Sequence, residues 1–269
     1  MRKIIYKIYR VIFARGKFYN INKAIYNLIV KGIGINNFES DKLSGEKNLL
    51  DKILIKYKNP VIFDIGANVG NYSESIKLLS PDSTLFSFEP HPKIYKSLEA
   101  SSKKSKYKAF NIALGKEESK LMLYDYENNT EGTEHASLFK ETFEKFYNEK
   151  VTSYEVDVIT LDKFVKENNI GTINLLKIDT EGNDYNVLLG AKESLTNGKI
   201  DIIHFEFNSM NVYSRVYFRD FFELLSNFDL YRLLPKSFIH IKKYEPIHCE
   251  IFAYQNIVAV RKDLNFKLT

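Results

Sequence analysis

The stretch VIFDIGANVGNYSESIKLL, residues 61–79, decides the fold that we expect for this chain. Its first five residues form a run of the length typical of a buried strand, with Asp64 as its one charge. Gly66 and Gly70 permit a tight turn, after which the spacing of apolar residues becomes that of a helix over 72–79. A strand, a glycine turn and a helix in this order predict the first unit of an α/β domain.

The alternation of strands and helices continues and predicts a Rossmann-like, doubly wound α/β fold with a mostly parallel sheet. We expect further helices over 91–102, 184–195 and 215–226. Further strands are expected at 84–88, 107–112, 173–178, 200–207 and 230–234. The last two strands, 250–253 and 257–260, are joined through Tyr254-Gln255-Asn256 and resemble a C-terminal antiparallel hairpin.

A long insertion interrupts this alternation at about residues 116–158. It contains two strand-like segments, 119–124 and 154–159, and a polar stretch between them at 127–150. Connections of this length inside a compact domain are uncommon and are usually functional or disordered. A substrate lid and a surface insertion are both consistent with the sequence.

A basic leader and linker, residues 1–45, precedes the α/β domain, which we place at 46–269. Residues 1–38 contain eight Lys or Arg and no Asp or Glu, whereas the remainder contains 31 basic and 34 acidic residues. We expect two N-terminal amphipathic helices here. They would either contact an anionic membrane surface or pack on the domain or on a second copy in a homo-oligomer; we favour packing.

Composition narrows the class of function. Cys249 is the only cysteine, so we expect no intrachain disulfide and no cysteine-based zinc site, and a reducing cytoplasm fits. The near-neutral charge beyond residue 38 argues against a nucleic-acid groove. No apolar run approaches the roughly 20 residues that cross a bilayer. We therefore expect a cytoplasmic protein, either free or peripheral to the inner face of the membrane.

The glycine turn and Phe88-Glu89-Pro90 together predict a nucleoside site. Glu89 ends the second expected strand, where a carboxylate can accept hydrogen bonds from ribose hydroxyls. The dinucleotide fingerprint has a glycine where this chain has Asn68, and Asp64 suits an ammonium group better than a pyrophosphate. S-adenosylmethionine has an ammonium group, a ribose and no phosphate. The alternative is a structural turn with a solvated Asp64.

Four motifs in order resemble the FkbM family of methyltransferases over about residues 60–260. They are Phe63-Asp64-Ile65-Gly66-Ala67-Asn68-Val69-Gly70, Phe88-Glu89-Pro90, Asn111-Ile112-Ala113-Leu114-Gly115 and Leu176-Lys177-Ile178-Asp179-Thr180-Glu181-Gly182. The resemblance implies S-adenosylmethionine as cofactor and O-methylation of a hydroxyl, often on a sugar or a polyketide-type product. We expect a sugar or glycan-type acceptor. The chain departs from the family pattern at Asn183 and Asp184, where a hydrophobic residue and a Glu are common.

The resemblance also implies roles for individual residues. The methionine part of the cofactor would be held by Asp64, Gly66, Asn68 and Gly70. The ribose would bind Glu89, which is followed by Pro90, and the adenine would lie beside Asn111 and Ala113. Asp179 would face the methyl donor, and Glu181 follows it in the same turn.

Methyl transfer to a hydroxyl benefits from a general base, which is worth about 10²–10⁴-fold in rate. Asp179 and Glu181 lie two residues apart, and one of two neighbouring carboxylates acquires a raised pKa that suits it to accept a proton. Glu206 and His204 point to one face at the end of a strand and are the next candidates for acceptor binding or base. His135, in the insertion, is a further candidate for acceptor contact. We identify no set of metal ligands.

Two other classes of protein stay open. A nicotinamide-dependent oxidoreductase could use the same fold, although Asn68 and the lack of a suitably placed Tyr-x-x-x-Lys pair argue against it. A nucleoside-binding interaction module without catalysis is the second alternative. The presence of Asp64, Glu89 and Asp179 together argues against a degenerate pocket.

Overall fold

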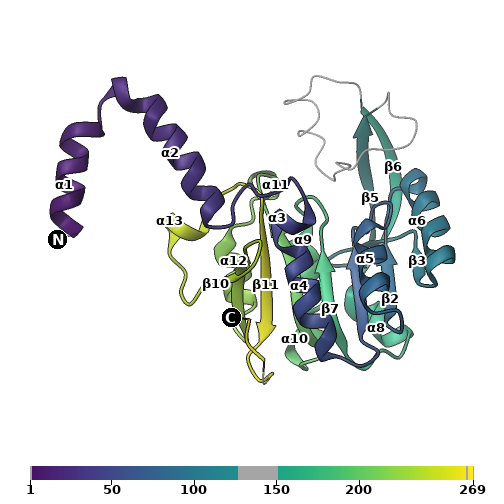
Figure 1. The fold of residues 1–269 in the computed structure, drawn as a ribbon. Helices are drawn as coiled ribbons and strands as arrows, with labels where there is room; N and C mark the ends of the chain where they lie inside the picture. Colours follow the sequence, from purple (N-terminus) through teal and green to yellow (C-terminus); the bar gives the residue numbers. More distant parts are fainter. Residues whose placement is uncertain (1, 127–150, 265, 269) are drawn as a thin grey trace.

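The computed structural model has two sheets, arranged as Figure 1 shows. It describes residues 2–126, 151–264 and 266–268. The main sheet has eight strands in the order β10-β9-β11-β8-β7-β1-β2-β3, and the small sheet has the order β4-β6-β5. The strands are β1 (Val61–Ile65), β2 (Thr84–Phe88), β3 (Lys108–Phe110), β4 (Ala113–Leu114), β5 (Ser119–Tyr126), β6 (Val151–Ile159), β7 (Ile173–Ile178), β8 (Ile200–Phe207), β9 (Phe228–Leu233), β10 (Phe238–His240) and β11 (Gln255–Arg261).

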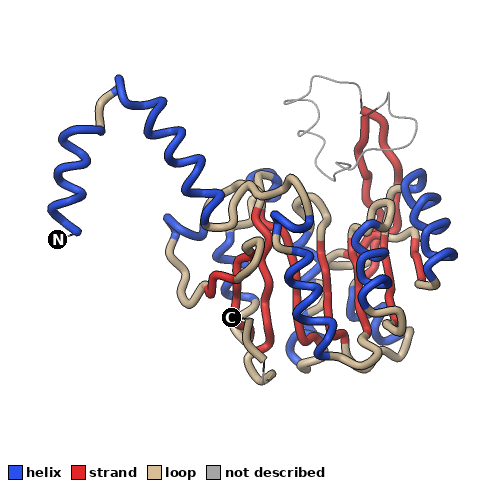
Figure 2. Tube along the Cα trace, viewed as in Figure 1, coloured by secondary structure: helices blue, strands red, loops and turns tan. Residues whose placement is uncertain are grey.

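Helices flank the main sheet, as the tube in Figure 2 shows. The helices that precede β1 are α1 (Arg2–Phe13), α2 (Tyr19–Gly32), α3 (Asp41–Ser44) and α4 (Glu46–Ile53), with short 3-10 turns at Gly16–Phe18 and Leu54–Lys56. The later helices are α5 (Asn71–Leu79), α6 (Pro92–Ser105), α8 (Leu161–Glu167), α9 (Asp184–Leu189), α10 (Lys192–Thr196), α11 (Met210–Ser214), α12 (Phe218–Leu224) and α13 (Pro246–Cys249).

The pairing of the strands confirms the doubly wound, mostly parallel fold. The neighbours β3, β2, β1, β7 and β8 are all parallel, so their carboxyl ends meet at one edge of the sheet. Antiparallel β11 lies between β8 and β9, and β10 is antiparallel to β9. The antiparallel C-terminal strands are therefore present, but the expected hairpin partner at 250–253 is not a strand. Those residues form an irregular loop, in which the Gln255 side chain donates to the carbonyl of Ile251 at 2.7 Å.

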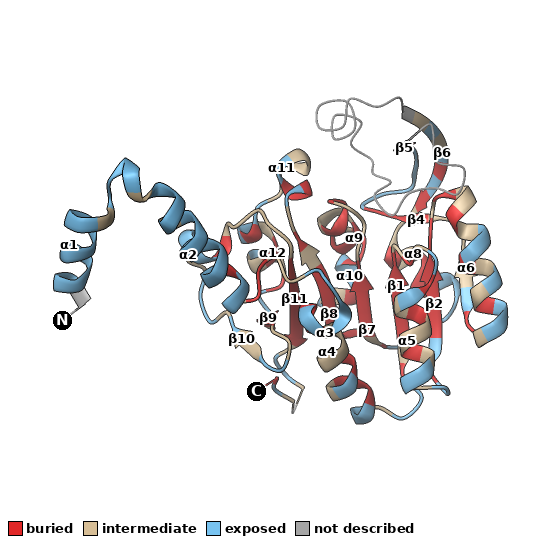
Figure 3. Ribbon diagram, turned by 45° about the horizontal axis from the view of Figure 1, so that its top comes forward, coloured by how far each residue is buried: buried red, intermediate tan, exposed pale blue. Residues whose placement is uncertain are grey.

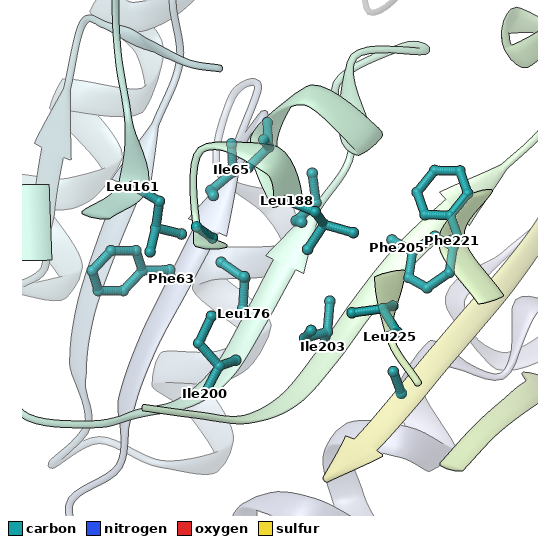
Figure 4. Packing of buried hydrophobic residues seen from close by; sticks show 14 of the residues in the cluster. Phe63, Ile65, Leu161, Leu176, Leu188, Ile200, Ile203, Phe205, Phe221 and Leu225 are labelled. Atoms are coloured by element: carbon teal, nitrogen blue, oxygen red, sulfur yellow. The ribbon is translucent and has the colours of Figure 1, made fainter. Parts of the chain in front are cut away.

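The core consists of two layers, one on each face of the main sheet. Alternate residues of a strand enter opposite layers: Ile62 and Ile202 pack with α4, α5 and α6, whereas Phe63 and Ile203 pack with α8, α9 and α12. Figure 4 shows the second layer, in which Phe205 and Phe221 stack with ring centroids 4.6 Å apart. Because both faces of the parallel strands are buried, their sequences are nearly continuous apolar runs.

The expected helix over 184–195 is two helices, α9 and α10, separated at Gly190. A Cβ at Gly190 would lie 2.0 Å from the carbonyl oxygen of Gly115. The chain after β4 therefore passes directly against this glycine, and the helix breaks at the crossing. In the insertion, β5 and β6 form a long antiparallel pair. The stretch 127–150, including His135, lies outside the described residues.

The N-terminal helices do not pack on the α/β domain, so this form of the packing that we favoured from the sequence is wrong, whereas packing on a second copy stays a prediction. Figure 3 shows α1 and α2 projecting from the domain with mostly exposed residues. On the expected inner face of α2, Ile21, Ile25 and Leu28 are 52%, 43% and 72% exposed. Among the described residues, α2 has one buried residue, Val30, where it meets the domain.

Candidate active site

A cavity of about 1290 Å³ opens at the carboxyl ends of β1, β2, β7 and β8. Parallel α/β sheets commonly bind ligands at this edge. Of the residues predicted from the sequence, those that line the cavity are Gly66, Asn68, Glu89, Pro90, Ala113, Asp179, Glu181 and Glu206. The structure thus brings together four motifs that are far apart in the chain.

The glycine turn after β1 is held against the neighbouring strands. The N–H groups of Gly66 and Ala67 both donate to the carbonyl of Phe88 at 2.9 Å. Gly66 has a φ of +76°, and a Cβ there would lie 1.7 Å from the carbonyl oxygen of Asp179. Only glycine fits this position. Asn68 is also left-handed, with a φ of 50°, and its side chain accepts from the N–H of Val69 at 2.6 Å.

Glu89 is fixed by backbone donors on both of its oxygens. Oε2 accepts from the N–H of Asn68 at 3.0 Å, and Oε1 accepts from the N–H of His91 at 2.8 Å. Burial raises the pKa of Glu89 to about 7, although these two hydrogen bonds oppose the rise. Each carboxylate oxygen has a second lone pair. Glu89 can therefore still accept from the two hydroxyls of a ribose.

Three residues that we expected to hold the cofactor, Asp64, Gly70 and Asn111, are not among those that line the cavity, and their cofactor roles stay predictions. Asp64 is fully buried; Ser73 Oγ donates to its Oδ2 at 2.6 Å. Gly70 is the N-cap of α5 with a φ of 98°, and a Cβ there would lie 2.6 Å from Tyr107 Oη. Asn111 Nδ2 donates to the carbonyls of Glu89 and Pro90 at 2.8 and 2.9 Å. These residues shape the loops that carry the lining residues.

Lys177 is a functional residue that the sequence reasoning missed. It is 6% exposed, and its Nζ lies 3.1 Å from Asp179 Oδ2 and 3.5 Å from Asp64 Oδ1. Burial alone would lower the pKa of Lys177, but Asp179, Asp64 and Glu46 raise it well above its usual value. The signal was present in the sequence, because Lys177 is the one charge in the apolar strand β7.

Asp179 and Glu206 form a coupled pair of carboxyl groups at the ends of β7 and β8. Desolvation, followed by the charges of Asp179, Glu181 and Asp184, raises the pKa of Glu206 well above its usual value. Desolvation also opposes ionisation of Asp179, but Lys177 and a hydrogen bond from Glu206 hold its pKa below the usual range. These opposite directions favour the proton on Glu206 and the negative charge on Asp179.

The turn after Asp179 places Glu181 on the cavity wall. Glu181 and Gly182 are both left-handed, with φ of 50° and 95°. A left-handed conformation is uncommon for Glu and is found most often where the surrounding structure enforces it, as at functional sites. The two residues that depart from the family pattern make hydrogen bonds within the fold: Asp184 Oδ2 accepts from Thr180 Oγ1 at 3.0 Å, and Asn183, which also lines the cavity, donates from Nδ2 to the carbonyl of Leu114 at 3.1 Å.

His204 does not line the cavity, so we assign it a positioning role instead of acceptor binding or proton transfer. It is 1% exposed, and its ring nitrogens lie 3.2 Å from Tyr72 Oη and 3.0 Å from Asn256 Oδ1. Burial, with the charge of Lys177, lowers the pKa of His204 to about 4. The ring is therefore neutral at pH 7. It holds Tyr72, whose ring lies 5.1 Å from Lys177 Nζ.

One wall of the cavity comes from the segment that we expected to be a linker. Asn36, Phe38 and Asp41 line the cavity, together with Glu46 at the start of α4. The N–H of Asn36 donates to the carbonyl of Tyr254 at 2.8 Å, and the rings of Phe38 and Tyr254 meet edge to face at 6.0 Å. Desolvation raises the pKa of Glu46. No motif in the sequence marks this wall, because it is assembled only by the fold.

The described residues hold no cluster of three or more His, Cys, Asp or Glu that is placed to bind a metal ion. The nucleoside-type loops, the glutamate at the end of β2 and the carboxyl pair beside them define a cofactor-dependent transferase on a Rossmann-like fold. The model of the methyltransferase FkbM domain matches residues 64–233, and the chain belongs to this family. It is therefore an S-adenosylmethionine-dependent methyltransferase.

Known proteins with similar sequences or structures include several methyltransferases. The 2-O-methyltransferase NoeI of Sinorhizobium fredii is 24% identical over 192 residues, which cover 68% of this chain and 78% of the relative. Methyltransferase 1 of Beauveria bassiana is 30% identical over 154 residues, 49% of this chain and 58% of the relative. The structure of an O-methyltransferase from Bacillus cereus superposes with a TM-score of 0.43 and 11% identity, covering 96% of this chain and 97% of that one.

Proposed function

We propose that this enzyme transfers the methyl group to a hydroxyl oxygen of a sugar or glycan-type acceptor, with Asp179 as the general base. The observation that carries the proposal is geometric: the Asp179 side chain lines the cavity, is 40% exposed and lies 3.1 Å from Lys177 Nζ, whose charge favours the ionised carboxylate. An ionised carboxylate that opens into the cavity can accept a proton from a hydroxyl. The name of NoeI, an O-methyltransferase, supports the same acceptor atom.

The lining residues fit the cofactor on its nucleoside side. Glu89 would accept hydrogen bonds from the ribose. Because Gly66 has no side chain, the turn after β1 can lie directly against the end of β7. The N–H of Asn68 donates to Glu89, so it would not donate to a pyrophosphate. This argues against a nicotinamide dinucleotide as the cofactor. When bound, S-adenosylmethionine would supply a methyl group activated by its sulfonium sulfur, and the demethylated thioether, S-adenosylhomocysteine, would be the leaving group.

The protein's own part in the reaction is to orient the acceptor and to take its proton. As the new C–O bond forms, the hydroxyl proton moves to Asp179. Lys177 and Glu206 keep Asp179 ionised before transfer, by charge and by a hydrogen bond. Glu181 lines the same cavity and remains our second candidate for acceptor contact.

The composition of the opposite wall supports a sugar. Phe38 and Tyr254 present aromatic rings, and Glu46 and Asn208 present polar groups in the same cavity. A sugar ring combines apolar C–H faces with hydroxyls at its edge, so both kinds of side chain would find a partner. Glu46 would accept hydrogen bonds from hydroxyls whether it is ionised or protonated.

The proposal is tested by incubating the full chain with labelled S-adenosylmethionine and matched panels of sugars, amines and carboxylic acids. We expect label in an ether that resists the mild alkali and acid treatments that release methyl esters. Asp179→Asn should abolish this product under the same conditions. Transfer to nitrogen or to a carboxylate, with sugars inert, would refute the proposed acceptor and leave the methyltransferase assignment intact.

A further inference from the structure

The helices α1 and α2 form a defined arm, residues 2–32. Tyr9 Oη on α1 donates to Asn22 Oδ1 on α2 at 2.7 Å, and Asn22 Nδ2 donates to the carbonyl of Phe13 at 3.0 Å. At the base of the arm, Val30 and Ile35 are buried in the domain. The arm therefore has a fixed internal geometry and a fixed point of attachment.

The arm exposes an unusual amount of apolar side chain. In the described part of the chain, 13 of the 24 large hydrophobic residues that are exposed lie between Ile4 and Ile29. On α1, Ile4, Ile8 and Ile12 occupy one face and are 64%, 53% and 45% exposed. A contiguous exposed apolar surface marks a site of interaction with another body.

The charge on the arm identifies the kind of partner. Residues 1–38 contain eight Lys or Arg and no Asp or Glu, and Lys3, Lys7 and Arg10 lie on α1 opposite the Ile4 face. A two-fold contact between two arms would bring like charges together, and the cores of protein interfaces are depleted in lysine. The surface of an anionic lipid bilayer offers negative charges to the basic face of α1. Just beneath them it offers an apolar layer to the apolar face.

We propose that the arm binds the surface of an anionic lipid bilayer, with α1 lying in the plane of the headgroups. The apolar face would enter the boundary between headgroups and acyl chains, and the basic face would remain beside the lipid phosphates. Within residues 2–126, 151–264 and 266–268, no helix is long and apolar enough to cross a membrane.

The position of the arm relates this surface to the cavity. The last residue of α2 is Gly32, and Asn36, four residues later, lines the cavity. Attachment of the arm to a bilayer would therefore hold the rim of the cavity close to the lipid surface. The proposal concerns the arm alone and does not depend on which acceptor the enzyme methylates.

The test is cosedimentation of the full chain with phosphatidylcholine vesicles, with and without phosphatidylglycerol, at low and high salt. We expect binding only to the anionic vesicles, and release as salt rises. One variant reverses the basic face (Lys3→Glu, Lys7→Glu, Arg10→Glu), and another removes the apolar face (Ile4→Ser, Ile8→Ser, Ile12→Ser). The matched control reverses three exposed lysines of the domain (Lys96→Glu, Lys104→Glu, Lys236→Glu).

Each basic residue near an anionic surface strengthens binding by about fivefold, so the basic-face variant should bind about 100-fold more weakly. The apolar-face variant should also detach, whereas the domain control should keep most of its binding. Affinity for S-adenosylmethionine, measured by calorimetry, should be the same in all four proteins. Equal losses in the arm and domain variants would overturn the proposal. So would an absence of vesicle binding together with light scattering that shows arm-dependent dimers.

Discussion

The ammonium of Lys177 lies 3.1 Å from the carboxylate of Asp179, two residues further along the chain. Alternate residues of a strand share a face, so the end of β7 presents the proposed base and a charge that favours its ionisation on one side of the sheet. The carboxyl of Glu206, on the neighbouring strand, completes the arrangement. The pH dependence and the size of the mutational effects follow from these three groups.

Lys177→Met should shift the acid limb of the pH–rate profile to higher pH. Activity requires ionised Asp179, whose pKa is held below its usual 3.8, so the wild-type rate should stay level as pH falls until Asp179 protonates. Without Lys177 the pKa of Asp179 rises, and the limb moves upward with it. The measurement is kcat/KM against pH, with exposed Lys104→Met as control. If the acid limb of the Lys177→Met profile lay at the same pH as in the wild type, the role assigned to Lys177 would be contradicted.

Asp179→Asn and Glu206→Gln should differ although each removes one carboxyl. Asparagine cannot accept the proton, so kcat should fall by about 10²–10⁴-fold. Glutamine can still donate a hydrogen bond to Asp179, so we expect Glu206→Gln to stay within about tenfold of the wild type, since one hydrogen bond contributes roughly 0.5–1.5 kcal/mol. Thermal unfolding of both variants separates chemistry from folding. If Glu206→Gln were the more damaging change, the base would be Glu206.

Glu89→Ala should weaken binding of S-adenosylmethionine by about 1.5–3 kcal/mol, the range for hydrogen bonds to a charged group. The variant also leaves the N–H groups of Asn68 and His91 without their acceptor, so the turn itself loosens. Isothermal titration calorimetry measures the change in affinity. Glu99→Ala, which removes a surface carboxylate from α6, is the control and should bind normally. An unchanged affinity of Glu89→Ala would place the ribose elsewhere.

Gly66→Ala should abolish cofactor binding and lower the melting temperature. The added Cβ would overlap the carbonyl oxygen of Asp179 at 1.7 Å, and the left-handed backbone alone costs roughly 1–3 kcal/mol for a residue with a side chain. Gly171→Ala is a matched control, because a Cβ there meets nothing within 4 Å. Calorimetry and thermal unfolding should show a loss for the first substitution and almost none for the second. Similar behaviour of the two would show that the turn can relax.

Phe38→Ala should raise KM for the acceptor and leave the affinity for S-adenosylmethionine unchanged. Phe38 is 64% exposed, so its removal does not open the core, but its ring meets Tyr254 in the proposed acceptor wall. We expect an increase in KM of up to about tenfold, in line with roughly 0.5–1.5 kcal/mol for a lost aromatic contact. Leu78→Ala, on the exposed side of α5, is the control. If only the affinity for S-adenosylmethionine changed, Phe38 would belong to the cofactor site and not to the acceptor wall.

The buried strands were the part of the fold that could be predicted most closely. The bounds 84–88, 173–178 and 200–207 agree with β2, β7 and β8, because both faces of these strands pack against helices and only apolar runs satisfy that. The break at Gly190 could not be predicted, since it depends on a contact with Gly115, 75 residues away. The irregular loop at 250–253 likewise depends on long-range hydrogen bonds that the local apolar pattern does not encode, since the N–H groups of Phe218 and Arg219 donate to the Glu250 carboxylate.

The candidate site divides in the same way. Residues in short motifs, such as Gly66, Glu89 and Asp179, were found because their spacing is local. Asp64 and His204 were expected at the cavity surface, yet they lie beneath it, since a strand position fixes the face of a side chain but not its depth. Phe38 and Glu46 were missed because chain folding alone brings them to the cavity.

The wall built from Asn36, Phe38 and Asp41 lies outside residues 64–233, the part that matches the family. If this wall contacts the acceptor, as we propose, part of the acceptor site lies outside the stretch that holds the cofactor and can change without altering it. A segment exchange of residues 36–46 between members of the family should transfer acceptor preference while the methyl-donor site stays intact. Enzymes of this family could then methylate different acceptors by the same reaction if only the residues of this segment, about eleven positions, varied.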